Sequence, residues 1–166
     1  MSRPSFAAAW SASMNIYSPA DPAGKVAKVI GGYVARNINA APPHNWENTC
    51  AVRMSYILNQ TGVSLPAIVG KTVSGADGRN YFFRVPDVIN FLTQHWGKPD
   101  LIASYPQSGG GSLAGKQGVI LFEVMGWDNA RGHATLWNGS SCYDHCYFNE
   151  PDATYRTNRA YFWSLP

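Results

Sequence analysis

The pair Asn138-Gly139 stands between two strand-like arms in the segment GHATLWNGSSCYDHC, and it is the strongest local constraint on the fold. An Asn-Gly pair is typical of a two-residue type I′ hairpin turn, in which both central residues need positive φ. Continuing the strand register from such a turn places His133 directly opposite Asp144. Their Cβ atoms would lie about 5 Å apart, close enough for the imidazole to hydrogen-bond the carboxylate. A polar pair on the hairpin surface, without a function, is the alternative interpretation.

The composition predicts one globular domain, residues 1–166, without a membrane-spanning segment. Of the 166 residues, 45% are hydrophobic and 14% are charged, which suits a packed core. The net charge of +3 is scattered without a basic block, so nucleic-acid binding is not indicated. The longest apolar run, Val119–Phe122, is far too short for membrane insertion. The N-terminal residues also lack the apolar core of a signal peptide, so we expect a soluble protein made in the cytoplasm without a signal peptide.

Helical patterns come first along the chain and strand patterns follow. Apolar spacing and capping residues predict helices at 5–14, 22–34, 49–61 and 86–96. Alternating and β-branched segments predict strands at 81–85, 101–105, 119–124, 133–137, 140–148 and 160–165. Five glycines between 108 and 118 indicate a flexible connection. The order indicates an α+β domain, with helices packed on an antiparallel sheet.

Cys50 is the candidate nucleophile, because it lies in the first turn of the third predicted helix. Unpaired N–H groups and the helix dipole favour a thiolate there. A helix-start thiol, followed in the chain by a histidine with its own acid, is the arrangement of papain-like catalysis. Cys50 would attack an amide carbonyl, His133 would transfer the proton and Asp144 would orient His133. Backbone N–H groups at the helix start, including that of Cys50, would form an oxyanion hole. A buried structural cysteine is the alternative.

Two further residues flank the nucleophile as oxyanion or substrate candidates. Asn48 is either the helix cap or a polar group near the site, and the cap is the favoured interpretation. Arg53 lies one helical turn after Cys50 and could add positive potential beside the thiol.

Cys142 and Cys146 enclose Asp144 in the sequence, and three states are open to them. An oxidised pair would hold Asp144 in place and would form only in an oxidising compartment. A zinc site with His145 and His133 is disfavoured, because a C-x₃-C spacing is not the usual knuckle and a fourth ligand is uncertain. Free thiols are the third possibility.

Several separate motifs occur in order along the chain: Asn48-Thr-Cys50-Ala-Val-Arg53-Met-Ser55-Tyr-Ile-Leu58, Ser74-Gly75-Ala76-Asp77, Asn129-Ala130-Arg131-Gly132-His133-Ala-Thr135-Leu136-Trp137-Asn138-Gly139 and Cys142-x-Asp144-x-Cys146. Together they resemble the fourth family of type VI secretion amidase effectors, and the resemblance extends from about Arg3 to the C-terminus. The resemblance implies a papain-like fold of the NlpC type, with Cys50, His133 and Asp144 as the catalytic residues. It also implies that Cys142 and Cys146 are the paired loop cysteines of the family.

The resemblance implies a peptidoglycan amidase that cleaves the γ-D-glutamyl to meso-diaminopimelate bond of Gram-negative stem peptides. It implies export by the type VI secretion apparatus into the periplasm of a target cell, and a cognate immunity protein as a partner. No cofactor or metal is expected. An acyltransferase or deamidase with the same three residues is one alternative, and a zinc-stabilised wall-binding module without catalysis is another. The loop His44-Asn-Trp46-Glu47 and the glycine-rich stretch 108–111 match no pattern of the family.

Overall fold

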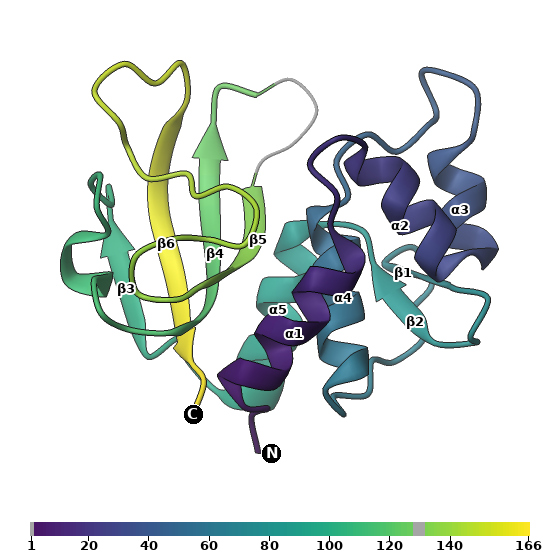
Figure 1. The fold of residues 1–166 in the computed structure, drawn as a ribbon, viewed down its shortest axis with the longest axis horizontal. Coiled ribbons are helices and arrows are strands. Elements are labelled where there is room, and N and C mark those ends of the chain that lie inside the picture. The colour runs from purple at the N-terminus through teal and green to yellow at the C-terminus, as the bar shows by residue number, and fades with distance from the viewer. Residues whose placement is uncertain (1, 128–131) are drawn as a thin grey trace.

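A computed structural model describes residues 2–127 and 132–166. Helices occupy the first part of the chain and the main sheet occupies the second (Figure 1). The elements in chain order are α1 (Phe6–Ile16), α2 (Pro22–Ile30), α3 (Gly32–Ile38), α4 (Cys50–Gln60), β1 (Thr72–Ser74), β2 (Asn80–Phe82), α5 (Val85–Trp96), β3 (Leu101–Ser104), the 3₁₀ turn η1 (Gly111–Leu113), β4 (Gly118–Met125), β5 (Gly132–Trp137) and β6 (Arg156–Ser164). This confirms the α+β class. Within the described ranges, no helix is long and apolar enough to cross a membrane.

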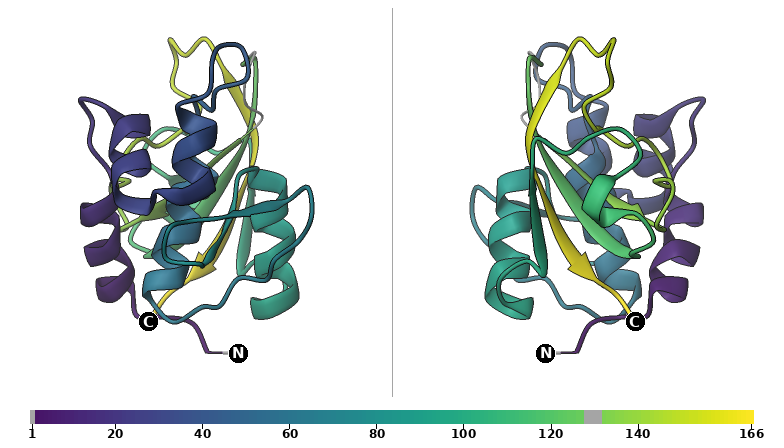
Figure 2. Two further views of the ribbon diagram at one scale, coloured as in Figure 1. Left: turned by 90° about the vertical axis from the view of Figure 1, so that its right-hand side faces the viewer. Right: turned by 90° about the vertical axis from the view of Figure 1, so that its left-hand side faces the viewer.

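The main sheet is antiparallel, with the strand order β3-β6-β4-β5, and separate cores cover its two faces. Alternate residues of β4 divide between these cores, as a strand period of two requires: Val119 and Leu121 pack with α1, α4 and α5, whereas Ile120 and Phe122 face η1 and the chain after β5. The turned views show α2 and α3 in front on one side of the molecule and η1 in front on the other (Figure 2). β5 is an edge strand, so the start of α4 can approach it from the side.

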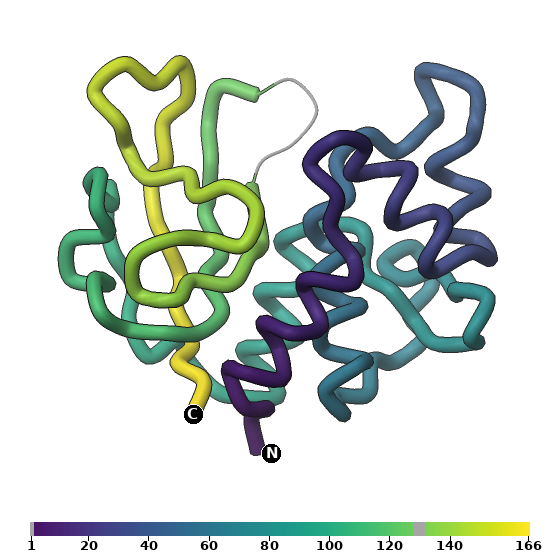
Figure 3. The backbone as a smooth tube through the Cα atoms, in the orientation of Figure 1, coloured from purple at the N-terminus to yellow at the C-terminus, as the bar shows by residue number. Residues whose placement is uncertain are grey.

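The two ends of the described chain lie close together below the sheet (Figure 3). The backbone N–H of Phe6, the first residue of α1, donates to the carbonyl of Pro166 at 2.7 Å. This contact joins the first helix to the last strand.

The expected helix over 22–34 is two helices, because the chain turns at Gly31. Gly31 has φ 65° and ψ −154°, a conformation that favours glycine and cannot continue a helix. Gly32 also has positive φ, and a Cβ there would lie 2.5 Å from the backbone of Gly75. Gly31 therefore ends α2, and Gly32 allows α3 to pack tightly against the β1 hairpin.

The expected strand over 140–148 is wrong. Asn138 does not form a type I′ turn: its side-chain Oδ1 accepts the N–H groups of Ser140 at 2.9 Å and Ser141 at 2.7 Å. This side-chain turn competes with the two-residue hairpin. Trp137 therefore pairs with Cys142 in one isolated bridge, and the following chain leaves the sheet as a loop.

The connection over 108–118 is more ordered than its five glycines predict. It contains η1, and Leu113 is fully buried. The indole N–H of Trp137 donates to the carbonyl of Leu113 at 2.9 Å. Gly110 lies so close to the Trp137 ring that a Cβ would come within 2.8 Å of it. The glycines thus permit close packing on the tryptophan.

Candidate active site

Cys50 is the first residue of α4, and the preceding chain caps the helix. The Cys50 N–H donates to Asn48 Oδ1 at 3.1 Å, so Asn48 satisfies one of the free donors at the helix start. The Cys50 side chain is buried, and its Sγ lies 3.9 Å from the carbonyl oxygen of Gly132 at the start of β5. The helix start and the sheet edge therefore meet at this sulfur. In this structure, Asn48 acts as an acceptor toward Cys50, and the expected oxyanion donor N–H is already engaged.

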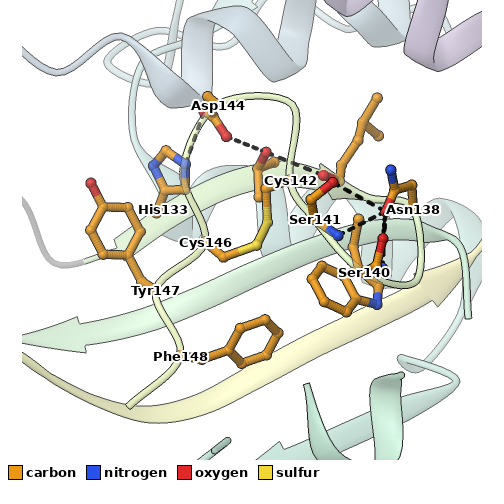
Figure 4. The surroundings of a disulfide bond; sticks show 12 residues. His133, Asn138, Ser140, Ser141, Cys142, Asp144, Cys146, Tyr147 and Phe148 are labelled. Atoms are coloured by element: carbon orange, nitrogen blue, oxygen red, sulfur yellow. Dashed lines mark hydrogen bonds and ion pairs between the residues drawn. A yellow bond between two sulfur atoms is a disulfide. The ribbon is translucent and has the colours of Figure 1, made fainter. Parts of the chain in front are cut away.

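His133 and Asp144 point toward one another across the side of β5 (Figure 4). His133 Nε2 lies 2.9 Å from Asp144 Oδ2, and both side chains are almost fully buried. The other carboxylate oxygen, Oδ1, accepts the hydroxyl of Thr135 at 2.5 Å. The two residues expected to be partners are thus brought together, although Asp144 reaches His133 from a loop and not from an opposing strand.

Arg53 is the second cation at the carboxylate, and its position differs from the one expected for a substrate contact. Its side chain is only 6% exposed, and Nη2 donates to Asp144 Oδ2 at 2.8 Å. Nη1 donates to the Thr49 hydroxyl at 2.9 Å and Nε to the Tyr143 hydroxyl at 3.2 Å. The guanidinium also lies over the Tyr17 ring, 5.0 Å from its centroid. All of these partners belong to the protein, so Arg53 holds the Asp144 loop against α4.

The charges of these residues shift one another's pKa values, and each shift favours the charged form of the residue. Burial alone would raise the pKa of Asp144, but His133 and then Arg53 lower it to about 2. Burial alone would lower the pKa of His133, but the Asp144 carboxylate raises it to about 9. Burial alone would raise the pKa of the Cys50 thiol, but its hydrogen bond with His133 and the charges of His133 and Arg53 bring it below its ordinary value. Both of these last shifts favour the pair of a thiolate and an imidazolium over the neutral pair.

Cys142 and Cys146 form a disulfide, with their Cα atoms 5.4 Å apart, on either side of Asp144 (Figure 4). This confirms the oxidised state among the three that the sequence left open. Both sulfurs are occupied by the bond, which excludes the zinc arrangement built on these thiolates. Among the described residues, no cluster of histidine, cysteine and acidic side chains could hold a metal ion. The disulfide closes a short loop that carries the carboxylate.

Sequence reasoning missed three side chains that touch the site. Thr135 lies two residues after His133 on the same strand, so the period of two could have placed it on the face of the histidine. Tyr143 contacts Arg53 from the disulfide loop. The ring of Tyr147 meets the imidazole of His133 edge-on, with centroids 4.8 Å apart. Positions 129–131 of the resembling motif lie outside the described residues.

Comparisons with known proteins identify the family. Residues 46–163 match the model of the type VI secretion system (T6SS) amidase effector protein 4 family, Tae4. Tae4 from Salmonella typhimurium, solved in complex with the immunity protein Tai4 from Enterobacter cloacae, is 41% identical, with a TM-score of 0.86 over 99% of this chain and 100% of that one. Tae4 from Enterobacter cloacae is also 41% identical, with a TM-score of 0.84 over the whole of both chains. A comparison with curated proteins found no match.

These similarities extend over the whole chain and include its fold, which is papain-like and of the NlpC type. Because the family model spans most of the sequence and the solved relatives are well above the identity at which only a fold is shared, the assignment does not depend on the three site residues alone. The chain belongs to the type VI secretion system amidase effector protein 4 family.

Proposed function

We propose that residues 1–166 form a cysteine amidase that hydrolyses the γ-D-glutamyl to meso-diaminopimelate bond of peptidoglycan stem peptides. One observation carries the proposal: the thiol at the start of α4 lies 3.9 Å from the carbonyl oxygen of Gly132, next to His133 on an edge strand, and the histidine is held by a buried carboxylate 2.9 Å away. The lowered pKa of Cys50 and the raised pKa of His133 supply the charged pair that this chemistry needs. Membership in an amidase effector family agrees with this chemistry.

In the proposed mechanism, the Cys50 thiolate attacks the amide carbonyl carbon, and the protonated His133 delivers its proton to the leaving amine. The carbon–nitrogen bond breaks and a thioester forms on the sulfur. His133, now neutral, takes a proton from water, whose oxygen attacks the thioester and releases the carboxylic acid and the thiolate. Asp144 stabilises the imidazolium throughout, and Arg53 and Thr135 keep the carboxylate in place.

The negative charge on the carbonyl oxygen would develop next to the start of α4, where the helix dipole favours it. The Cys50 N–H is the nearest donor, and Asn48 Oδ1 accepts it in the free protein. Asn48 is exposed, so its side chain can turn into the solvent and release this donor to the substrate. Asn48 would thus be a cap in the resting protein and would yield the N–H during the reaction.

We further propose that the protein acts in the periplasm of a target cell after type VI secretion and is inhibited by a cognate immunity protein. Solved relatives of this chain are complexes of Tae4 with Tai4, which supports a partner of the Tai4 kind. The disulfide beside Asp144 suits an oxidising compartment.

Mass spectrometry of products from purified Gram-negative peptidoglycan tests the proposed function. We expect the wild type to release one new amine, on diaminopimelate, and one new carboxylate, on D-glutamate. Cys50→Ala, which removes only the sulfur, should leave the substrate intact while the protein stays folded by circular dichroism. Cleavage by Cys50→Ala at the wild-type rate, or products without a new free amine, would refute a cysteine hydrolase.

A further inference from the structure

A surface groove of about 610 Å³ opens beside the nucleophile and has no role so far. Asn48, which caps Cys50, forms part of its wall, and Phe83 and Arg84 form another part immediately before α5. The next residue, Val85, packs against Gly132, the residue whose carbonyl meets the Cys50 sulfur. The groove therefore extends between the 42–48 loop and the start of α5, and Asn48 places one end of it next to the start of α4, where Cys50 lies.

Three side chains in this groove form a continuous stack. The rings of Trp46 and Phe83 lie parallel within 24°, with centroids 5.0 Å apart, and the guanidinium of Arg84 lies 4.8 Å from the centroid of Phe83. The backbone N–H of Trp46 donates to the Asn37 carbonyl at 3.0 Å, which fixes the loop to α3. The Trp46 end of the stack is therefore fixed to the folded protein.

Arg84 is exposed, and its one hydrogen bond to the described part of the chain runs from Nη1 to the carbonyl of Gly70, at 3.2 Å. The remaining N–H groups of this planar cation can bind a carboxylate in a bidentate manner. Because the guanidinium is stacked on Phe83, little side-chain freedom is lost on binding. Glu47 also lines the groove, and its negative charge repels an anion. A carboxylate would therefore bind at the end of the groove formed by Arg84.

We infer that this groove is a substrate subsite in which Arg84 binds a carboxylate of the stem peptide, while the Trp46 and Phe83 rings support its apolar parts. The inference rests on the proposed function and deepens it, because it assigns recognition of the substrate to residues outside the three at the sulfur. Stem peptides carry several carboxylates close to the scissile amide, and the net charge of +3 favours an anionic ligand.

The test uses a set of otherwise identical stem peptides in which each carboxylate in turn is replaced by a primary carboxamide. We expect the wild type to prefer the free acid over one of these amides by roughly 10- to 100-fold in kcat/KM, the usual effect of a hydrogen bond to a charged group. Arg84→Gln should lose the same factor on the free acid and no longer distinguish that pair. Arg84→Lys, which keeps the charge without the fork, should lie between them.

Arg156→Gln is the matched control, because Arg156 is also exposed and stacks on an aromatic ring, 4.7 Å from Tyr105 at the far edge of the sheet. It removes the same charge and should keep the wild-type preference. The subsite is refuted if Arg84→Gln cleaves the free acid as fast as the wild type, or if the wild type cleaves every amidated peptide equally well. If the folded wild type cleaves no stem peptide at all, the proposed function itself fails, and the subsite fails with it.

Discussion

Asp144→Asn is the most informative single change, because it keeps the shape of the side chain and removes the charge that both His133 and Arg53 face. The carboxylate is 1% exposed and lies within 3 Å of both cations. Removing one partner of a buried ion pair leaves uncompensated charge and costs about 3–5 kcal/mol of stability. Typical domains have about 5–15 kcal/mol, so we expect a folded but less stable protein.

The variant should lose far more activity than its lower stability alone would explain. Without the carboxylate, burial is the largest remaining influence on His133 and lowers its pKa from about 9. Less imidazolium is then present at neutral pH, and the thiolate loses part of the charge that stabilises it. We expect kcat/KM to fall by about 10²- to 10⁴-fold.

Two pH profiles measure this prediction, one of kcat/KM and one of the free energy of unfolding. In the wild type, the contribution of the depressed Asp144 pKa is complete above about 4 and is lost as the pH falls through about 2. The contribution of the raised His133 pKa is complete below about 6.5 and is lost as the pH rises through about 9. These are two views of one attraction and do not add. The stability difference between wild type and variant should therefore be largest between these limits.

Asp100→Asn is the matched control, because Asp100 pairs with Arg3 near the surface and its side chain is 41% exposed. An exposed pair contributes about 0–1 kcal/mol, and this variant should keep the wild-type rate. If Asp144→Asn loses no more stability than Asp100→Asn and keeps kcat/KM within about threefold of the wild type, the assigned role of the carboxylate is wrong.

Four further variants probe the surroundings of the site. Replacing Cys142 and Cys146 by Ser should cost about 2 kcal/mol in urea unfolding and lower kcat/KM by loosening the loop of Asp144, whereas an unchanged rate would show that the bridge is not needed. Asn48→Ala should lose about 1 kcal/mol of stability as a cap, and Asn48→Asp should move the acid limb of the kcat/KM profile to higher pH, because a carboxylate raises the pKa of the Cys50 thiol. Gly132→Ala should cost about 1–3 kcal/mol in thermal unfolding and most of the activity, because its Cβ would lie 2.8 Å from a backbone carbonyl; a stable, active variant would contradict this packing.

Local patterns predicted the helix that begins at Cys50 and the strand that carries His133, because capping and periodicity are properties of neighbouring residues. The predicted contact between His133 and Asp144 is present, but the hairpin register from which it was predicted is not. Asn138 caps its own turn with its side chain, so the register that would have placed the two residues opposite one another is absent. The disulfide loop brings Asp144 to the same place.

The hydrogen bonds that hold the carboxylate could not be predicted from periodicity. Arg53 and Asp144 are 91 residues apart in the chain, and their contact depends on how the start of α4 meets the edge of the sheet. The residues around Arg53 come from the segment before α2, from the start of α4 and from the disulfide loop, so no local window contains them. The break at Gly31 lies inside the helix expected over 22–34, and it depends on the positive φ that Gly31 adopts in the folded protein.

The start of α4 and the edge strand β5 belong to opposite halves of the chain, and the sulfur and the imidazole come from different halves. A chain that had formed its helices and its sheet separately would contain every residue of the site, but the Cys50 thiol would keep its ordinary pKa, because it would lack the imidazole of His133. The lowered pKa of this thiol is therefore an indicator of tertiary assembly in this protein.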